Sequence, residues 1–209
     1  MLDKLNEIEI RVLGVLIEKS KTTPEYYPLT LNALITACNQ KTSRNPVMQL
    51  AEEEVIEALD SLKKKQLIAH VIGASGSRAL KYRHTLAVKH PLDPAEISVL
   101  CLLFLRGPLT SGEINSNSSR LFEFDSLQEV QETIEQLKNY TPPFVLTLER
   151  KPGQKEDRHF HCFTDEIPLI SESNHYEDST KNEKILALET KVQELSEKIE
   201  KIYRELGLE

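Results

Sequence analysis

The feature of this sequence that most constrains its fold is an internal repeat, in which one order of helix and strand signals occurs twice. The stretch that begins at Leu5 returns 87 positions later at Leu92, and each copy places a helix-capping residue three positions before a Glu. Pro28-Leu29-Thr30 is echoed by Pro108-Leu109-Thr110, where Pro ends one segment and Thr is suited to cap a second helix. The chain of 209 residues therefore has room for two copies of one small module.

A third helix and a hairpin complete each copy. Residues 55–62 match residues 130–137 at an offset of 75, with apolar side chains at helical spacing in both. Two pairs of strand-like runs, within 67–84 and 144–163, align at an offset of 77 and have glycine in their turns. Three helices followed by a hairpin are the plan of a winged helix. The sequence therefore predicts a mainly α fold with small β-hairpins, an α+β protein with two tandem winged-helix domains.

The last part of the chain differs from both copies. Residues 164–182 lack apolar periodicity and are expected to form a linker. In residues 183–209 the apolar side chains alternate at spacings of three and four, the a and d pattern of a parallel two-stranded coiled coil. The alternative is a helix that folds back onto the chain's own domains. We predict domain 1 in residues 1–90, domain 2 in residues 91–163, and a homodimer formed through Ile185, Leu188, Val192, Leu195, Ile199, Ile202 and Leu206.

Composition narrows the class of protein. No apolar stretch reaches the ~18 residues of a membrane span, and the first residues lack a secretory signal. Three cysteines without a CxxC pair fit a reducing cytoplasm, so we expect a cytoplasmic protein. The net charge of −7 is uneven, because residues 1–90 hold 13 Lys and Arg against 10 Asp and Glu, whereas the remainder is acidic. Any nucleic-acid contact therefore belongs to the first copy.

Several longer motifs point to a known family. Arg11 to Lys19 reads RVLGVLIEK, and residues 37–48 read ACNQKTSRNPVM. With these motifs the chain resembles the YceH-like family of bacterial proteins, to which no activity is assigned, and the match covers residues 8–163. The resemblance implies a tandem winged-helix fold in a bacterial cytoplasmic protein, and it implies no particular chemistry.

No group of side chains forms a convincing catalytic or metal site. His159 and His161 lie two positions apart on a predicted strand, but no Cys or carboxylate stands at a metal-ligand spacing from them. Cys101 lies in an apolar run, and Cys38 has no obvious His partner. We therefore expect a non-enzymatic protein with no cofactor, no metal and no small-molecule substrate.

Two functions remain, and they differ in the partner. A winged helix conventionally places its third helix in the major groove of DNA and its wing along the backbone. The lead expectation is therefore association with double-stranded DNA through the first copy. The alternative is an adaptor that binds a protein partner in a larger assembly and is dimerised by its C-terminal helix. The candidate phosphate contacts are Lys41, Arg44, Arg78, Lys81 and Arg83.

Two further features bear on this choice. The third helix of the first copy opens with Glu52-Glu53-Glu54, which would repel DNA. The motif loop before this helix has either a binding role or a structural one, in which Asn45-Pro46 forms a turn and Val47 and Met48 fill the core. Cations that converge on one face would favour nucleic acid, and scattered cations would favour the adaptor. The polar or turn-forming residues of the motif loop are Asn39, Gln40, Ser43, Asn45 and Pro46.

Overall fold

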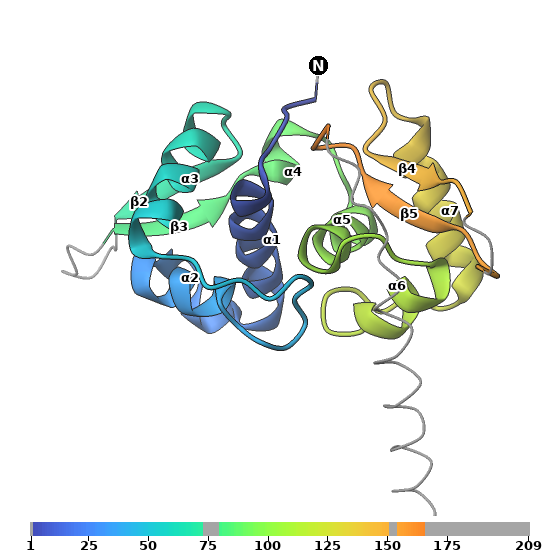
Figure 1. Ribbon diagram of the computed structural model, residues 1–209, viewed down its shortest axis with the longest axis horizontal. Helices are drawn as coiled ribbons and strands as arrows, with labels where there is room; N and C mark the ends of the chain where they lie inside the picture. The colour runs from blue at the N-terminus through green and yellow to red at the C-terminus, as the bar shows by residue number, and fades with distance from the viewer. Residues whose placement is uncertain (1, 73–79, 151–153, 166–209) are drawn as a thin grey trace, which may run out of the picture. The chain divides into compact units, whose positions relative to one another are not determined.

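A computed structural model describes residues 2–72, 80–150 and 154–165, and these residues belong to one compact unit (Figure 1). The described part is a mixed α+β fold with seven α-helices, one 3-10 turn and two antiparallel sheets. Arg78 and the C-terminal segment 183–209, with its predicted dimer seam, lie outside the described residues, as does the predicted linker after residue 165.

The elements follow the order expected from the repeat. The first half contains α1 (Glu7–Thr22), η1 (Pro24–Tyr26), β1 (Leu29–Thr30), α2 (Leu31–Cys38), α3 (Glu52–Lys64), β2 (Ile68–Ile72) and β3 (Leu80–His84). The second half follows the short helix α4 (Leu86–Lys89) and contains α5 (Pro94–Arg106), α6 (Ser111–Ser118), α7 (Leu127–Asn139), β4 (Val145–Leu148) and β5 (Arg158–His161).

Local capping explains where the first helix of each half begins. The Asn6 side chain accepts a hydrogen bond from the backbone N–H of Glu9, and the Glu9 carboxylate accepts one from the backbone N–H of Asn6. Asp93 and Glu96 form the same capping box at the start of α5. Each box satisfies two backbone donors that the helix leaves free, so the predicted starts of both helices are confirmed.

The two hairpins pair in the same register. His70 of β2 lies opposite Tyr82 of β3, and Thr147 of β4 lies opposite His159 of β5, 77 positions further on in both strands. The first sheet has the order β1-β3-β2, and the counterpart of its β1 pairing in the second half is a single bridge between Leu109 and His159. Strand β1 was not predicted, because two residues are too short to show an alternating pattern.

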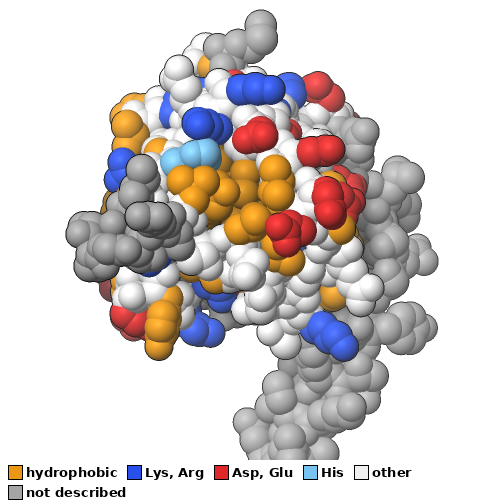
Figure 2. Space-filling model, turned by 90° about the vertical axis from the view of Figure 1, so that its left-hand side faces the viewer, with side chains coloured by type: hydrophobic (Ala, Val, Ile, Leu, Met, Phe, Trp, Pro, Cys, Tyr) orange, Lys and Arg blue, Asp and Glu red, His pale blue; other side chains and the backbone are white. Residues whose placement is uncertain are grey.

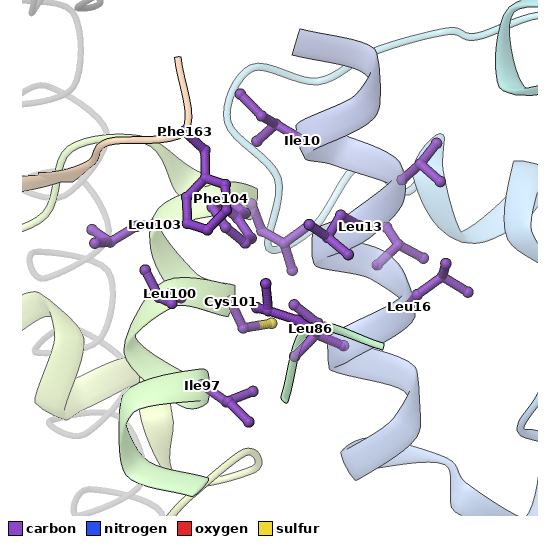
Figure 3. Packing of buried hydrophobic residues seen from close by; sticks show 14 of the residues in the cluster. Ile10, Leu13, Leu16, Leu86, Ile97, Leu100, Cys101, Leu103, Phe104 and Phe163 are labelled. Atoms are coloured by element: carbon purple, nitrogen blue, oxygen red, sulfur yellow. The ribbon is translucent and has the colours of Figure 1, made fainter. Parts of the chain in front are cut away.

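Helices α1 and α5 form the centre of the unit, where the two halves meet (Figures 1 and 3). Almost every residue from Ile10 to Ile17 is without exposed surface, and residues 96–105 of α5 are buried in the same way. A Cβ atom added to Gly14 would lie only 2.9 Å from Leu105 Cδ2 and 3.0 Å from Phe104 Cβ. The missing side chain therefore lets the two helices approach closely.

Candidate functional site

The motif loop between α2 and α3 is anchored by a buried arginine. The guanidinium of Arg44 has no exposed side-chain surface, and its Nη2 lies 2.6 Å from Glu18 Oε2. It also donates hydrogen bonds to the carbonyl of Ala37 at the end of α2 and to the Gln40 side chain. This pairing corrects the prediction for Arg44, because a guanidinium enclosed by the protein presents no surface to a phosphate.

Other residues of the motif loop also have structural partners. The Asn39 side chain accepts from the backbone N–H of Leu50 at 2.8 Å and donates to its carbonyl at 3.0 Å. The backbone N–H of Asn45 donates to the carbonyl of Leu105 at 2.8 Å, which joins the loop to the end of α5. The Ser43 hydroxyl accepts from Arg106, and the Pro46 carbonyl accepts from the buried Arg11.

The tip of the motif loop does not fill the core. Val47 is 53% exposed and Met48 is partly exposed, which is contrary to the alternative in which both plug the interior. Polar contacts of Arg11 and Arg44 hold the loop instead, and both arginines interact with groups distant in sequence. Sequence patterns could not reveal this arrangement, because the carboxylate of Glu18 lies 26 residues before Arg44.

The remaining predicted cations do not gather around α3. Lys41 is exposed in the motif loop, whereas Lys81 and Arg83 lie on β3. Successive side chains of a strand point to opposite faces, so Lys81 and Arg83 occupy the sheet face opposite to that of Tyr82. Tyr82 is on the α3 side of the sheet, where it interacts with Asp60. The two wing cations therefore point away from the third helix.

A different group of side chains lies along the exposed stripe of α3 and on the hairpin beside it. Glu53, Ile56, Glu57 and Asp60 follow helical spacing and share one side of this helix. His70, Leu80 and Tyr82 lie on the neighbouring face of the β2–β3 hairpin. We call these seven residues the α3–hairpin face. Figure 2 shows this side of the molecule, with an apolar area bordered by acidic side chains, basic side chains and a histidine.

The centre of the α3–hairpin face is apolar. Ile56 is 38% exposed and Leu80 is 40% exposed, although both are large hydrophobic residues. The rings of His70 and Tyr82 contact each other edge to face, with centroids 5.1 Å apart. Burial, together with the nearby charge of Lys63, lowers the pKa of His70, which favours its neutral form.

The border of this face along α3 carries three acidic side chains, whereas Lys63 adds a cation beside His70, with its Nζ 3.5 Å from the ring Nδ1. Within the described part of the chain, no Lys, Arg or His side chain lies within 4.0 Å of the carboxylates of Glu53, Glu57 or Asp60. Lys65, which follows α3, forms its ion pair with another element, because its Nζ lies 2.6 Å from Glu9 Oε1 of α1.

Sequence reasoning did not single out Ile56. Its position outside the buried stripe of Val55 and Leu59 was the signal that could have revealed it.

The equivalent side of the second half is polar and hollow. A cavity of about 550 Å³ lies between α6, α7 and the β4–β5 hairpin. At the offset of 75, Gln131 takes the place of Ile56. His159 takes the place of Tyr82 and lies 3.3 Å from both the Ser111 and the Thr147 hydroxyl. The two halves thus share their backbone plan but present different chemistry at the same position.

Nothing in the described residues suggests a metal site, since no group of three His, Cys, Asp or Glu side chains is placed to hold an ion. Burial raises the pKa of Cys38 to about 12, so its thiol is not a ready nucleophile. No helix in the described ranges has both the length and the apolar character needed to cross a bilayer.

These features define a class of α+β protein in which two related halves share a core and present unlike surfaces. Comparison with known proteins gives the family: residues 5–154 match the model described as "Protein of unknown function, DUF480", and the chain belongs to this family. A UPF0502 protein of Geotalea uraniireducens is 49% identical over 195 residues, which cover 90% of this chain and 88% of that protein. A UPF0502 protein of Geobacter sulfurreducens is 45% identical over 195 residues with the same coverage. These matches confirm the family expected from the motifs.

Proposed function

We propose that the chain is a non-enzymatic, cytoplasmic adaptor built from two winged-helix modules, which binds a protein partner on the α3–hairpin face. The observation that carries this proposal is the exposure of Ile56 at the centre of the stripe that a DNA-reading helix would place in the major groove. Exposed apolar areas with a polar border are typical of surfaces that bind other proteins. A base-reading helix would instead carry amide and cationic side chains at these positions.

The distribution of charge supports the same choice over DNA. Glu53, Glu57 and Asp60 place three carboxylates on the side of α3 that would face the phosphates, and like charges at an interface suppress binding. Lys81 and Arg83 are directed to the other face of the sheet. Among the predicted phosphate contacts in the described residues, only Lys41 remains near α3 in sequence. The cations of α3 itself, Lys63 and Lys64, lie in its last turn, whereas its first turn is acidic.

The test of the docking surface is site-specific photocrosslinking from the face itself. A photoreactive amino acid placed at Ile56 in the full chain is expected to form discrete adducts with protein in a bacterial lysate. The matched control is Val88, which is 85% exposed on α4 and lies outside the face. Adducts formed from position 56, absent from position 88 and removed by Leu80→Glu support the proposal. Equal adducts from both positions contradict it.

A salt titration separates the adaptor from a DNA-binding protein. The full chain is mixed with random duplex DNA over a range of salt concentrations. A protein that contacted ~5 phosphates would show a slope of log affinity against log salt near −4 to −5. We expect no binding, even at low salt. Binding that is lost on Lys81→Glu with Arg83→Glu would favour a DNA-binding role through the hairpin and contradict the adaptor.

A further inference from the structure

Building on the proposed function, we infer that the partner of the α3–hairpin face is a basic protein segment, with an apolar side chain held between Lys or Arg residues. The inference rests on the proposed docking role, and it adds the chemistry of the partner. Within the described residues, three carboxylates without a cation inside 4.0 Å share one side of α3 with the exposed Ile56, so the face complements a segment with the opposite charge and one apolar anchor.

The spacing of the carboxylates sets the spacing of the partner's cations. Glu53 and Glu57 are four positions apart on α3, so they are separated by about 6 Å along the helix axis, with Ile56 between them. Asp60 lies about 10 Å from Glu53 along the same axis. Two cations one helical turn apart on a partner helix would match Glu53 and Glu57, and an apolar residue between them would meet the exposed Ile56, with Leu80 as the other exposed apolar side chain of the face.

The hairpin supplies the apolar wall of the same site. Asp60 on α3 is close enough to the hairpin for its charge to act on the pKa values of both His70 and Tyr82, beside the larger effect of burial. An incoming cation would therefore meet the Asp60 carboxylate at the edge of the hairpin, which attracts it. Leu80 extends the apolar wall toward the end of the strand.

Two other occupants of the face are disfavoured by charge. The chain's own segment 183–209 carries five Lys and Arg against seven Glu, which gives −2, so it brings no positive excess to an acidic surface. A second copy would set the acidic stripe of one α3 against the acidic stripe of another, which costs free energy. A basic segment from a different protein avoids both conflicts.

The second half provides an internal comparison, because its equivalent helix lacks the anchor. Gln131 replaces Ile56 there, and Gln128 replaces Glu53, although Glu132 and Glu135 preserve the other two carboxylates. Glu135 is already paired with Lys138 at 2.7 Å. A basic segment with an apolar anchor should therefore select the first half.

The experiment measures binding of two designed peptides to the full chain by fluorescence anisotropy. One peptide is an amphipathic helix with Arg at positions i and i+4 and Leu between them, and the other has Glu in place of each Arg. We expect the Arg peptide to bind and the Glu peptide not to bind. The triple substitution Glu53→Gln, Glu57→Gln and Asp60→Asn should weaken binding of the Arg peptide about tenfold, because three exposed charge pairs are lost.

The matched control removes carboxylates from the second half. Glu132→Gln with Glu135→Gln should leave the affinity within twofold of the wild type. Equal binding of the two peptides, absence of binding by the Arg peptide, or an unchanged affinity in the triple variant would overturn the basic partner. The crosslinks from position 56 would still appear in that event if the face binds a protein of other chemistry. Absence of the crosslinks from position 56 would instead contradict the docking role itself.

Discussion

At the scale of single residues, the pair formed by Glu18 and Arg44 shows how a charge can fix a loop from inside. Burial opposes ionisation of Glu18, but the hydrogen bonds and charge of Arg44 outweigh it and lower the pKa of the Glu18 carboxyl. The ion pair therefore persists at neutral pH. Its second set of bonds, to the carbonyl of Ala37, ends α2 where the motif loop begins.

Removal of Arg44 is expected to destabilise the protein strongly. Arg44→Ala leaves the Glu18 carboxylate with only the ammonium of Lys19, at 3.4 Å, and the cost is expected to be about 3 kcal/mol, the lower end of the range for loss of one member of a buried ion pair. The free energy of unfolding from urea denaturation measures the effect. The control is Lys41→Ala in the same loop, where the side chain is exposed and the change should stay within about 0.5 kcal/mol. Similar values for the two variants would show that the pair contributes little.

His161 gives the fold a dependence on pH. Burial, with a smaller effect of the Lys4 charge, lowers the pKa of His161 to about 3 in the folded chain, whereas the unfolded value is near 6.5. The folded state therefore binds this proton less readily, and stability is full above pH 6.5 and falls as the pH drops toward 3. Between pH 6.5 and 5, this one group lowers the free energy of unfolding by about 2 kcal/mol.

The variant His161→Phe isolates this dependence. The ring lies among aromatic side chains, with centroids 5.0 Å from Phe104 and 6.4 Å from Phe163, so phenylalanine fits its surroundings. At pH 7.5, urea denaturation measures how the substitution changes the free energy of unfolding through packing alone. At pH 5, the measured value also includes the effect of protonating His161 in the unfolded wild type. Between pH 7.5 and pH 5, we expect the free energy of unfolding of the variant to fall by about 2 kcal/mol less than that of the wild type. Parallel losses in both proteins would contradict the assignment.

At the scale of elements, the close contact of α1 and α5 depends on the glycine at position 14. A side chain there meets Leu105 and Phe104 at about 3 Å, so Gly14→Val must push the helices apart, and overpacking of this kind costs about 1–3 kcal/mol. Leu105→Ala removes the closest atoms. In a double-mutant cycle measured by urea denaturation, the two substitutions together should therefore destabilise less than the sum of the single effects. Strict additivity would mean that the contact is not tight.

The elements also show which parts of the fold can be predicted from sequence. Helix starts and hairpin register depend on neighbours in the chain, so the capping residues Asn6 and Asp93 and the offset of 77 predicted them correctly. The partner of Arg44 depends on a contact between distant segments, and the alternation of β3 places the wing cations Lys81 and Arg83 together on the sheet face opposite to that of Tyr82. The candidate site could not be predicted, because it is defined by what lies beside Ile56 in space.

At the scale of the whole molecule, contacts beyond the α1–α5 core join the halves. The backbone N–H of Leu5 donates to the carbonyl of Phe163, and Lys4 donates to the carbonyl of Cys162 at 3.2 Å. The motif loop makes the second connection, through Asn45 and Leu105. The start of the chain and the motif loop of the first half are thus both tied to the second half.

The predicted seam in residues 183–209 determines whether the proposed adaptor would present one docking face or two. A parallel coiled coil would give a homodimer with two copies of the α3–hairpin face, and linked sites bind a repeated partner far more tightly than one site does. Light scattering of the full chain should then give a mass of twice 23.9 kDa. Leu188→Glu with Leu195→Glu places charges at two d positions and should reduce the mass to that of one chain. The control Thr190→Glu with Gln193→Glu lies at f and b positions, away from the seam, and should remain dimeric. A single-chain mass for the wild type would contradict the seam and leave an adaptor with one docking face.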